Sequence, residues 1–139
     1  MPGEFAAIAR YFAPLATHPG AFGLKDDLAW LAPRAGRRLV FKTDAIVVGV
    51  HTLAADDPAL IARKALRVNL SDLAGKGARP LGYLLAIALP PTTDAAWLRR
   101  FAAGLARDQA EFGLSLLGGD TTRTPGPATI AITALGEAL

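Results

Sequence analysis

The sequence contains no cysteine, so the fold can have neither a disulfide framework nor a thiolate metal site. It also contains no apolar run that approaches the roughly 20 residues of a membrane-spanning helix. The N-terminus lacks the basic-then-apolar pattern of a signal peptide. These absences fit a reducing compartment, and we expect a cytoplasmic protein with no membrane partner.

A strong charge imbalance and long polar or repetitive tracts are absent as well. The net charge is +3, and the one tight basic group, Arg34, Arg37 and Arg38, has no interleaved aromatic residues on which bases could stack. We therefore expect no nucleic-acid partner. Hydrophobic residues make up 52% of the 139 residues and charged residues 19%, and this balance predicts one globular domain.

Three common catalytic signatures are missing too: the P-loop, the zinc-protease pattern and a cysteine nucleophile. What the chain has instead is a group of carboxylates in apolar surroundings. Of its twelve acidic residues, five lie in or beside apolar segments. These five are Asp26, Asp27, Asp44, Asp72 and Asp120.

Residues 58–80 are predicted to form a helix that begins at Pro58. Asn69 and Asp72 fall on its apolar face, where a carboxylate is costly unless a cation compensates it. The last turns of a helix also carry the negative end of its dipole. We therefore expect a positive charge beside Asp72, and a metal ion and an ion pair with Arg63 or Arg79 are equally favoured by this helix alone. The predicted polar face consists of Arg63, Lys64, Arg67 and Ser71.

Two further stretches place oxygen ligands in apolar sequence. Asp26 and Asp27 interrupt residues 22–31, which indicates either a cation between adjacent carboxylates or a solvated turn. Residues 38–50 predict a largely buried strand, in which Asp44 is a poor strand former. Thr43 precedes this aspartate and His51 follows the strand; each of these two, taken singly, is more often structural than functional.

Near the C-terminus, a short strand at 114–117 is predicted to run into a phosphate-type loop at 118–123, with the sequence GGDTTR. Two glycines let backbone N–H groups approach an anion, and Asp120 could hold a metal ion on that same anion. A tight turn that needs positive φ explains the glycines equally well.

The remaining patterns complete the predicted fold. A docking helix at 4–17, a strand at 81–89 and a strand at 129–139 follow from hydrophobic periodicity. A helix at 94–112, capped by Thr92 or Thr93, is expected to turn its charged residues, Asp108 included, mostly toward water. This order predicts an α+β fold with helices packed on one face of a mixed β-sheet. If the five aspartates converge, they form an all-oxygen site suited to Mg²⁺.

Five segments resemble, in order and spacing, the N-terminal motifs of thiamine-monophosphate kinase. This family belongs to the superfamily of aminoimidazole ribonucleotide synthetase and selenophosphate synthetase. The resemblance spans nearly the whole chain and implies the N-terminal domain of the aminoimidazole ribonucleotide synthetase-like fold. Residues 1–139 would then be a single ATP- and Mg²⁺-binding domain, with the C-terminal domain of the family absent from this chain. The segments are EFAAIARYF from Glu4, LKDDLAWL from Leu24, KTDAIVVGVH from Lys42, RKALRVNLSDLAGKGARP from Arg63 and LLGGDTTRTPGP from Leu116.

The resemblance also implies roles for individual residues. Gly119 and Asp120 would belong to the ATP site, and His51 would contact thiamine phosphate. The implied reaction is the ATP- and Mg²⁺-dependent phosphorylation of thiamine monophosphate to thiamine diphosphate. Such a phosphoryl transfer needs no protein nucleophile, so no catalytic side chain is assigned. The implied Mg²⁺ ligands are Asp27, Thr43, Asp44, Asp72 and Asp120.

Two positions depart from the family pattern. Lys25 stands where the family usually has glycine or a small residue, and Lys42 stands where it has serine or threonine. Lys42 removes one metal-facing oxygen and brings a positive charge, which changes the expected number of metal ions.

Two alternatives to this kinase stay open. One is a superfamily enzyme with another small substrate, and the other is a non-catalytic dimerisation or nucleotide-binding module. We also expect a homodimer, because the apolar strands around Val47 and Leu85 exceed what one small domain can cover.

Overall fold

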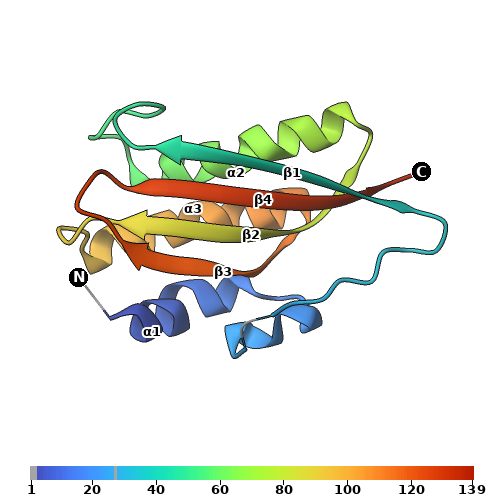
Figure 1. The fold of residues 1–139 in the computed structure, drawn as a ribbon, viewed down its shortest axis with the longest axis horizontal. Helices are drawn as coiled ribbons and strands as arrows, with labels where there is room; N and C mark the ends of the chain where they lie inside the picture. Colours follow the sequence, from blue (N-terminus) through green and yellow to red (C-terminus); the bar gives the residue numbers. More distant parts are fainter. Residues whose placement is uncertain (1–2, 27) are drawn as a thin grey trace.

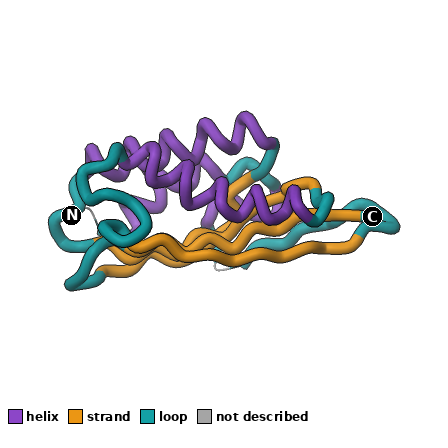
Figure 2. Tube along the Cα trace, turned by 90° about the horizontal axis from the view of Figure 1, so that it is seen from above, coloured by secondary structure: helices purple, strands orange, loops and turns teal. Residues whose placement is uncertain are grey.

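The computed structural model describes residues 3–26 and 28–139 and arranges them in two layers, a sheet and the helices that cover one of its faces (Figures 1 and 2). The strand order is β1-β4-β2-β3. Strand β4 pairs antiparallel with β1 and β2, whereas β2 and β3 are parallel. The prediction of a mixed sheet with helices on one face is therefore confirmed. The strands are β1 (Arg38–Val47), β2 (Arg79–Leu89), β3 (Ser115–Arg123) and β4 (Thr129–Ala138).

Helix α2 (Pro58–Gly75) begins as predicted, with Pro58 in its first turn. The Asp57 carboxylate accepts the N–H of Ala59 at 3.0 Å and so caps one of the free backbone donors at the helix start. Lys76 follows the last turn, and no residue of the predicted helix beyond Gly75 is helical.

Helix α3 (Ala95–Phe112) packs against α2. Its predicted cap was wrong: Asp94, rather than Thr92 or Thr93, accepts the N–H of Trp97 at 2.8 Å. The helix ends at Gly113, which adopts the left-handed conformation that favours glycine. The two helices approach so closely at Gly104 that a Cβ there would lie 2.3 Å from the Ala59 carbonyl oxygen.

A continuous core fills the space between the helices and the sheet. Buried Tyr83 donates a hydrogen bond to Gln109 Oε1 at 2.7 Å, and Gln109 Nε2 donates to the Leu15 carbonyl at 2.9 Å. One glutamine therefore ties α3 to β2 and to the N-terminal segment. The largest buried aliphatic and aromatic residues include Leu66, Leu73, Ile87, Phe101, Leu105, Ile130 and Ile132.

The N-terminal segment lies along the β3 edge of the sheet (Figure 1). The predicted docking helix at 4–17 is helical but irregular. It consists of α1 (Glu4–Ala7), a π-helical turn (Ile8–Phe12) and a 3₁₀ turn (Ala13–Leu15). Residues 16–18 are not helical, and a separate 3₁₀ segment (Pro19–Leu24) follows them.

Strand β1 differs from the predicted buried strand at 38–50, since it ends at Val47 and forms an edge of the sheet. Only Ile46 of this strand is buried. Successive side chains alternate between the two faces, and Phe41 is 62% exposed on the face away from α2. Strand type was predictable from β-branched residues, but burial depends on which strands pair.

Strand β3 corrects a second prediction. Residues 118–123 continue the strand instead of forming a phosphate-type loop. The pairing with β2 shifts between Tyr83 and Leu84, which leaves Leu117 as an extra residue of β3. Gly119 has φ +147°, and a Cβ there would lie 1.8 Å from the Leu85 carbonyl oxygen. Gly119 is therefore required by strand packing.

Among the helices of residues 3–26 and 28–139, none has the length and apolar character that crossing a membrane would demand.

Candidate functional site

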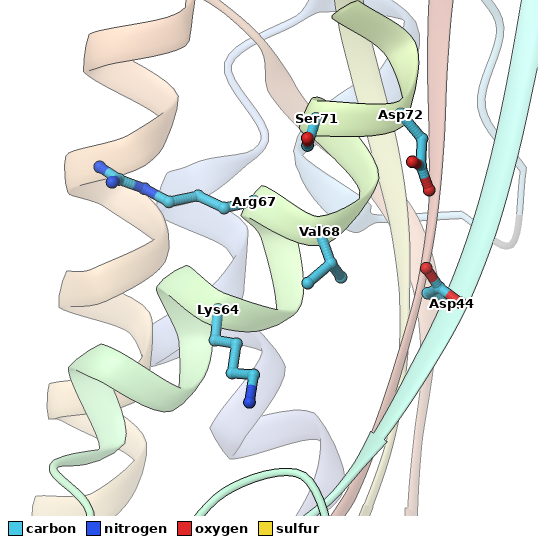
Figure 3. Close-up of a pocket in the computed structure, with 6 residues that line it drawn as sticks. All are labelled: Asp44, Lys64, Arg67, Val68, Ser71 and Asp72. Atoms are coloured by element: carbon cyan, nitrogen blue, oxygen red, sulfur yellow. The ribbon is translucent and has the colours of Figure 1, made fainter. Parts of the chain in front are cut away.

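Asp44 on β1 and Asp72 on α2 point toward each other across the gap between strand and helix (Figure 3). Side chains alternate along a strand, so Lys42 and Asp44 project from the same face of β1. Lys42 Nζ lies 3.4 Å from Asp44 Oδ2 and 3.5 Å from Asp72 Oδ2. One ammonium group therefore bridges two carboxylates from different elements, and we call these three residues the carboxylate site.

The carboxylate site is half-exposed. The side chain of Asp72 is 54% exposed and that of Asp44 is 42% exposed, so the placement of Asp72 in the apolar interior was wrong. The expected cation beside Asp72 is present, but it is Lys42 rather than Arg63 or Arg79. The hydrogen bond to Asp44, followed by the charges of both carboxylates, holds the pKa of Lys42 above its usual value and keeps the ammonium charged.

An open cavity of about 550 Å³ adjoins the two carboxylates. Lys64 lines it and donates a hydrogen bond to the His51 carbonyl. Arg67 extends away from the carboxylates toward α3 (Figure 3), where Asp108 accepts two of its hydrogen bonds, each at 3.0 Å. The cavity thus carries negative charge at one end and the Lys64 ammonium at the other. Its lining consists of Asp44, Lys64, Arg67, Val68, Ser71 and Asp72.

Thr43, a predicted metal ligand, directs its hydroxyl away from the carboxylate site. The Thr43 hydroxyl lies on the opposite face of the sheet, where it donates to the Ile132 carbonyl and accepts from Thr133. The Thr43 carbonyl, however, accepts from Lys42 Nζ at 3.3 Å. Any contribution of Thr43 to a cation at the carboxylate site therefore comes from its backbone oxygen.

His51 lies in the exposed segment that follows β1. Its Nδ1 accepts the N–H of Val47 at 2.9 Å, which fixes the imidazole against the strand end. His51 does not line the cavity, but its carbonyl accepts a hydrogen bond from Lys64, which does. Its contact with substrate stays a prediction.

Asp120 and Gly119 line a different cavity, of about 690 Å³, between the N-terminal segment and β2 and β3. Strands β1 and β3 are opposite edges of the sheet. Asp44 pairs with Ile132 of β4, Ile132 with Leu85 of β2, and Leu85 with Gly119 of β3. Adjacent strands lie about 4.8 Å apart, so Asp44 and Gly119, three strands apart in one row, are separated by roughly 14 Å. Asp120 therefore does not join the carboxylate site within this chain. Lys25 and Asp26 line the cavity of Asp120.

Asp27, the fifth predicted ligand, lies outside the described residues. Asp26 is exposed and accepts the N–H of Leu28 at 3.2 Å, as a solvated turn would require. Within the described part of the chain, no three His, Cys, Asp or Glu side chains come together as a metal site. The convergence of five aspartates is thus reduced here to the pair of Asp44 and Asp72.

This pair fits a magnesium ion by the chemistry of its donors. Mg²⁺ is usually held by one or two carboxylates and completes its octahedron with water and substrate phosphate oxygens. Asp44 and Asp72 supply the carboxylates, and their exposure leaves room for the other ligands. Lys42 already lies between them, so a metal ion there must share both carboxylates with an ammonium group.

Sequence reasoning missed an ion cluster between the helices that is centred on a buried aspartate. Asp108 is fully buried, although it was predicted to face water. Arg63 Nε lies 3.3 Å from Asp108 Oδ1, and Arg67 Nε lies 3.0 Å from Asp108 Oδ2. A signal was available, because Asp108 follows Phe101 by seven residues and Leu105 by three, on the same stripe of α3. We call Arg63, Arg67 and Asp108 the buried cluster.

The fold and the motifs define a family. The family model for the AIR synthase related protein, N-terminal domain, matches residues 25–138, and the chain belongs to this family.

Two similar relatives are thiamine-monophosphate kinases. That of Caulobacter vibrioides is 51% identical over 138 residues, which cover 99% of this chain and 39% of the relative. That of Escherichia coli K12 is 43% identical over 132 residues, 94% of this chain and 40% of the relative. The chain thus spans about two fifths of their length.

Solved structures agree with this placement. Thiamine-monophosphate kinase from Stenotrophomonas maltophilia K279a is 40% identical with a TM-score of 0.75, over 83% of this chain and 35% of that one. AaThiL complexed with AMPPCP and TMP is 27% identical with a TM-score of 0.72, and the match covers 86% of this chain and 42% of that one. The hydrogenase maturation protein HypE in complex with ATP, 24% identical with a TM-score of 0.82 over 100% and 41%, supports the fold alone.

Proposed function

We propose that this chain is the ATP- and metal-binding part of a thiamine-monophosphate kinase. The reaction transfers the γ-phosphoryl group of ATP to the phosphate of thiamine monophosphate, giving ADP and thiamine diphosphate. The observation that carries the proposal is the pair of Asp44 and Asp72, facing each other from β1 and α2 beside an open cavity. The 51% identity to the Caulobacter vibrioides kinase supports the choice of substrate.

Each residue has a proposed part in binding. Asp44 and Asp72 hold Mg²⁺ through the carboxylate oxygens that Lys42 does not contact, with the Thr43 carbonyl beside them. Asp27 and Asp120 bind further Mg²⁺. Bound Mg²⁺ supplies neutralisation and alignment of two polyanions, which is most of what phosphoryl transfer requires. Lys64 adds positive charge at the far end of the cavity for a phosphate group. Gly119 and Asp120 contact ATP, and His51 contacts thiamine monophosphate.

The distance between the two cavities bears on domain organisation. Asp120 and the carboxylate site lie at opposite edges of one sheet. We infer that residues 1–139 act as one domain and that a second domain, with the length by which the relatives exceed this chain, completes the ATP and substrate sites. A cytoplasmic location goes with this biosynthetic role.

We also infer a homodimer through the sheet face that α2 and α3 do not cover. Phe41, Leu39 and Leu84 are exposed there and form an apolar patch. Of the two residues around which the dimer was predicted, Leu85 is buried in the core, whereas Val47 is half-buried on the same face of β1 as Phe41. Sedimentation tests this inference: Phe41→Glu should convert a dimer to a monomer, whereas a wild-type mass that stays monomeric at every concentration contradicts it.

The function is tested with the polypeptide that carries this chain, including any residues that follow Leu139. With ATP and Mg²⁺, it should convert thiamine monophosphate to thiamine diphosphate in preference to a panel of other small phosphate and amine acceptors. Preference for a different acceptor would favour another enzyme of the superfamily. No turnover of any acceptor, together with intact ATP binding in calorimetry, would favour a binding module.

A further inference from the structure

We propose that Lys42 is a built-in cation, whose ammonium group occupies the position of one divalent metal ion between Asp44 and Asp72. The site of this chain then takes up fewer metal ions than a site with a hydroxyl residue at position 42. The inference rests on the proposed function where it names Mg²⁺ as the metal, but the arrangement itself is a property of three residues of this chain.

The geometry around Lys42 Nζ is that of a coordinated cation. Three oxygens surround it: Thr43 O at 3.3 Å, Asp44 Oδ2 at 3.4 Å and Asp72 Oδ2 at 3.5 Å. A lysine ammonium has three N–H donors and no acceptor, so three oxygens match its hydrogen-bonding capacity. Two carboxylates and a backbone carbonyl are also the oxygen ligands that Mg²⁺ takes in proteins.

Neighbouring cations are engaged elsewhere. Lys64 donates to the His51 carbonyl, and Arg67 is held by Asp108. Among the ion pairs of the described residues, Lys42 is the one cation within 4.0 Å of either Asp44 or Asp72. Without it, two carboxylates from β1 and α2 would face each other with no neutralising charge, and like charges at such a separation repel.

A divalent ion cannot simply be added to this arrangement. Placing Mg²⁺ on the same carboxylate oxygens would bring it within a few ångströms of the ammonium, where the repulsion of the two cations offsets the attraction of the carboxylates. The chain therefore carries part of the neutralising charge as a side chain, and this part does not depend on the concentration of free Mg²⁺.

The test is to count cations with Mn²⁺ as the probe, by electron paramagnetic resonance and calorimetry on the whole chain. Lys42→Met removes the positive charge but keeps an unbranched side chain of similar length. Lys42→Thr removes the charge and introduces a hydroxyl oxygen. Both variants should bind Mn²⁺ about tenfold more tightly than the wild type or bind one more equivalent, because the competing cation is gone. Lys76→Thr is the control, since it removes one positive charge from an exposed position just beyond α2. It should change Mn²⁺ affinity less than about twofold, because an exposed charge is screened by water and salt.

A second readout follows folding. In the absence of metal, Lys42→Met and Lys42→Thr should unfold at a lower temperature than the wild type, since Asp44 and Asp72 then repel each other. Mn²⁺ should restore that loss and should raise the unfolding temperature of the variants more than that of the wild type. Equal Mn²⁺ number and affinity in wild type and both variants, including no binding by any of them, would overturn the proposal. Neither measurement requires turnover. The proposal about Lys42 can therefore hold if the kinase proposal fails, and the kinase proposal can hold if the proposal about Lys42 fails.

Discussion

Two groups of charged residues join α2 to its neighbours, and they differ in how far water reaches them. In the buried cluster, Asp108 is fully buried and is held by Arg63 and Arg67. In the carboxylate site, Asp44 and Asp72 are about half-exposed and share one ammonium group beside an open cavity. The first group has more cations than carboxylates, and the second has more carboxylates than cations.

This difference separates a structural ion cluster from the proposed binding site. Burying a carboxylate costs free energy unless cations and hydrogen-bond donors surround it, and both arginine partners of Asp108 come from α2. Asp108 is out of reach of a dissolved ligand, and we assign it the structural role of joining the two helices. The carboxylate site keeps negative charge in excess and keeps contact with solvent, so a dissolved cation or a metal-bound phosphate can reach it. The same types of side chain therefore serve stability in one place and, in the proposed function, ligand binding in the other.

The largest expected effect is on turnover at the carboxylate site. In the polypeptide that carries this chain, Asp72→Asn should lower the proposed phosphorylation of thiamine monophosphate by about 1000-fold, since a metal ion at the transferred phosphate contributes several kcal/mol to catalysis. Stability to urea should change by less than about 0.5 kcal/mol, because the side chain is half-exposed. Steady-state kinetics and urea unfolding of the same preparation check both parts. Undiminished turnover would remove Asp72 from the site.

The buried cluster should respond in the opposite way. Asp108→Asn should destabilise the chain by about 3 kcal/mol, because it leaves Arg63 and Arg67 between two helices without their carboxylate. Mn²⁺ binding by the fraction that remains folded should be unchanged. Urea unfolding measures the first effect and calorimetry the second. A loss of Mn²⁺ affinity with normal stability would reverse the roles of the two groups.

The contrast between these groups marks how much the sequence could predict. Helix α2 was predictable, because Pro58 opens it and its apolar residues follow helical spacing. Asp72 was correctly expected to need a cation, since a carboxylate late in a helix is unfavourable alone. The identity of that cation depends on the placement of β1 beside α2, which no local pattern encodes. Lys42 was therefore recognised as a departure from the family but not as the partner of Asp72.

Asp108 shows a case in which the sequence predicted the wrong environment, solvent instead of the protein interior. An aspartate on a helix with arginines at 99, 100 and 107 has the composition of a solvated face, and charged residues are rarely fully buried. Tertiary packing of α3 on α2 buries this one residue, with two arginines of the other helix around it. In the same way, the edge position of β1 and the continuation of β3 through Gly119 depend on strand pairing, which the local sequence does not specify.

Glu137 provides a third carboxylate for comparison and predicts a pH dependence. Its buried side chain accepts the N–H of Arg34 at 2.9 Å, and the guanidinium groups of Arg79 and Arg34 also contact it. The backbone hydrogen bond first, and then the arginines, lower the pKa of Glu137 from 4.5 to about 2. Because the folded-state pKa lies below the unfolded one, its stabilisation is present above pH 4.5 and is lost as the pH falls toward 2.

Glu137→Gln isolates this contribution. Thermal unfolding followed between pH 2 and pH 6 should show a lower midpoint for the variant at pH 6 and a smaller difference from wild type at pH 2. Asp94→Asn offers a control at an exposed carboxylate, since asparagine also caps helices well. A difference between wild type and Glu137→Gln that stays constant over this range would contradict the assigned cause.

The smallest expected effect comes from the solvent-exposed end of the buried cluster. Arg67 also pairs with Glu111 at 3.1 Å, and the Glu111 side chain is 54% exposed. An exposed ion pair gains little in water and loses side-chain entropy, so Glu111→Gln should cost less than about 0.5 kcal/mol in urea unfolding. The two substitutions, Asp108→Asn and Glu111→Gln, remove one negative charge each from the same arginine and differ mainly in burial. Equal losses of stability would show that net charge around Arg67, and not exclusion of water, distinguishes the buried cluster from the carboxylate site.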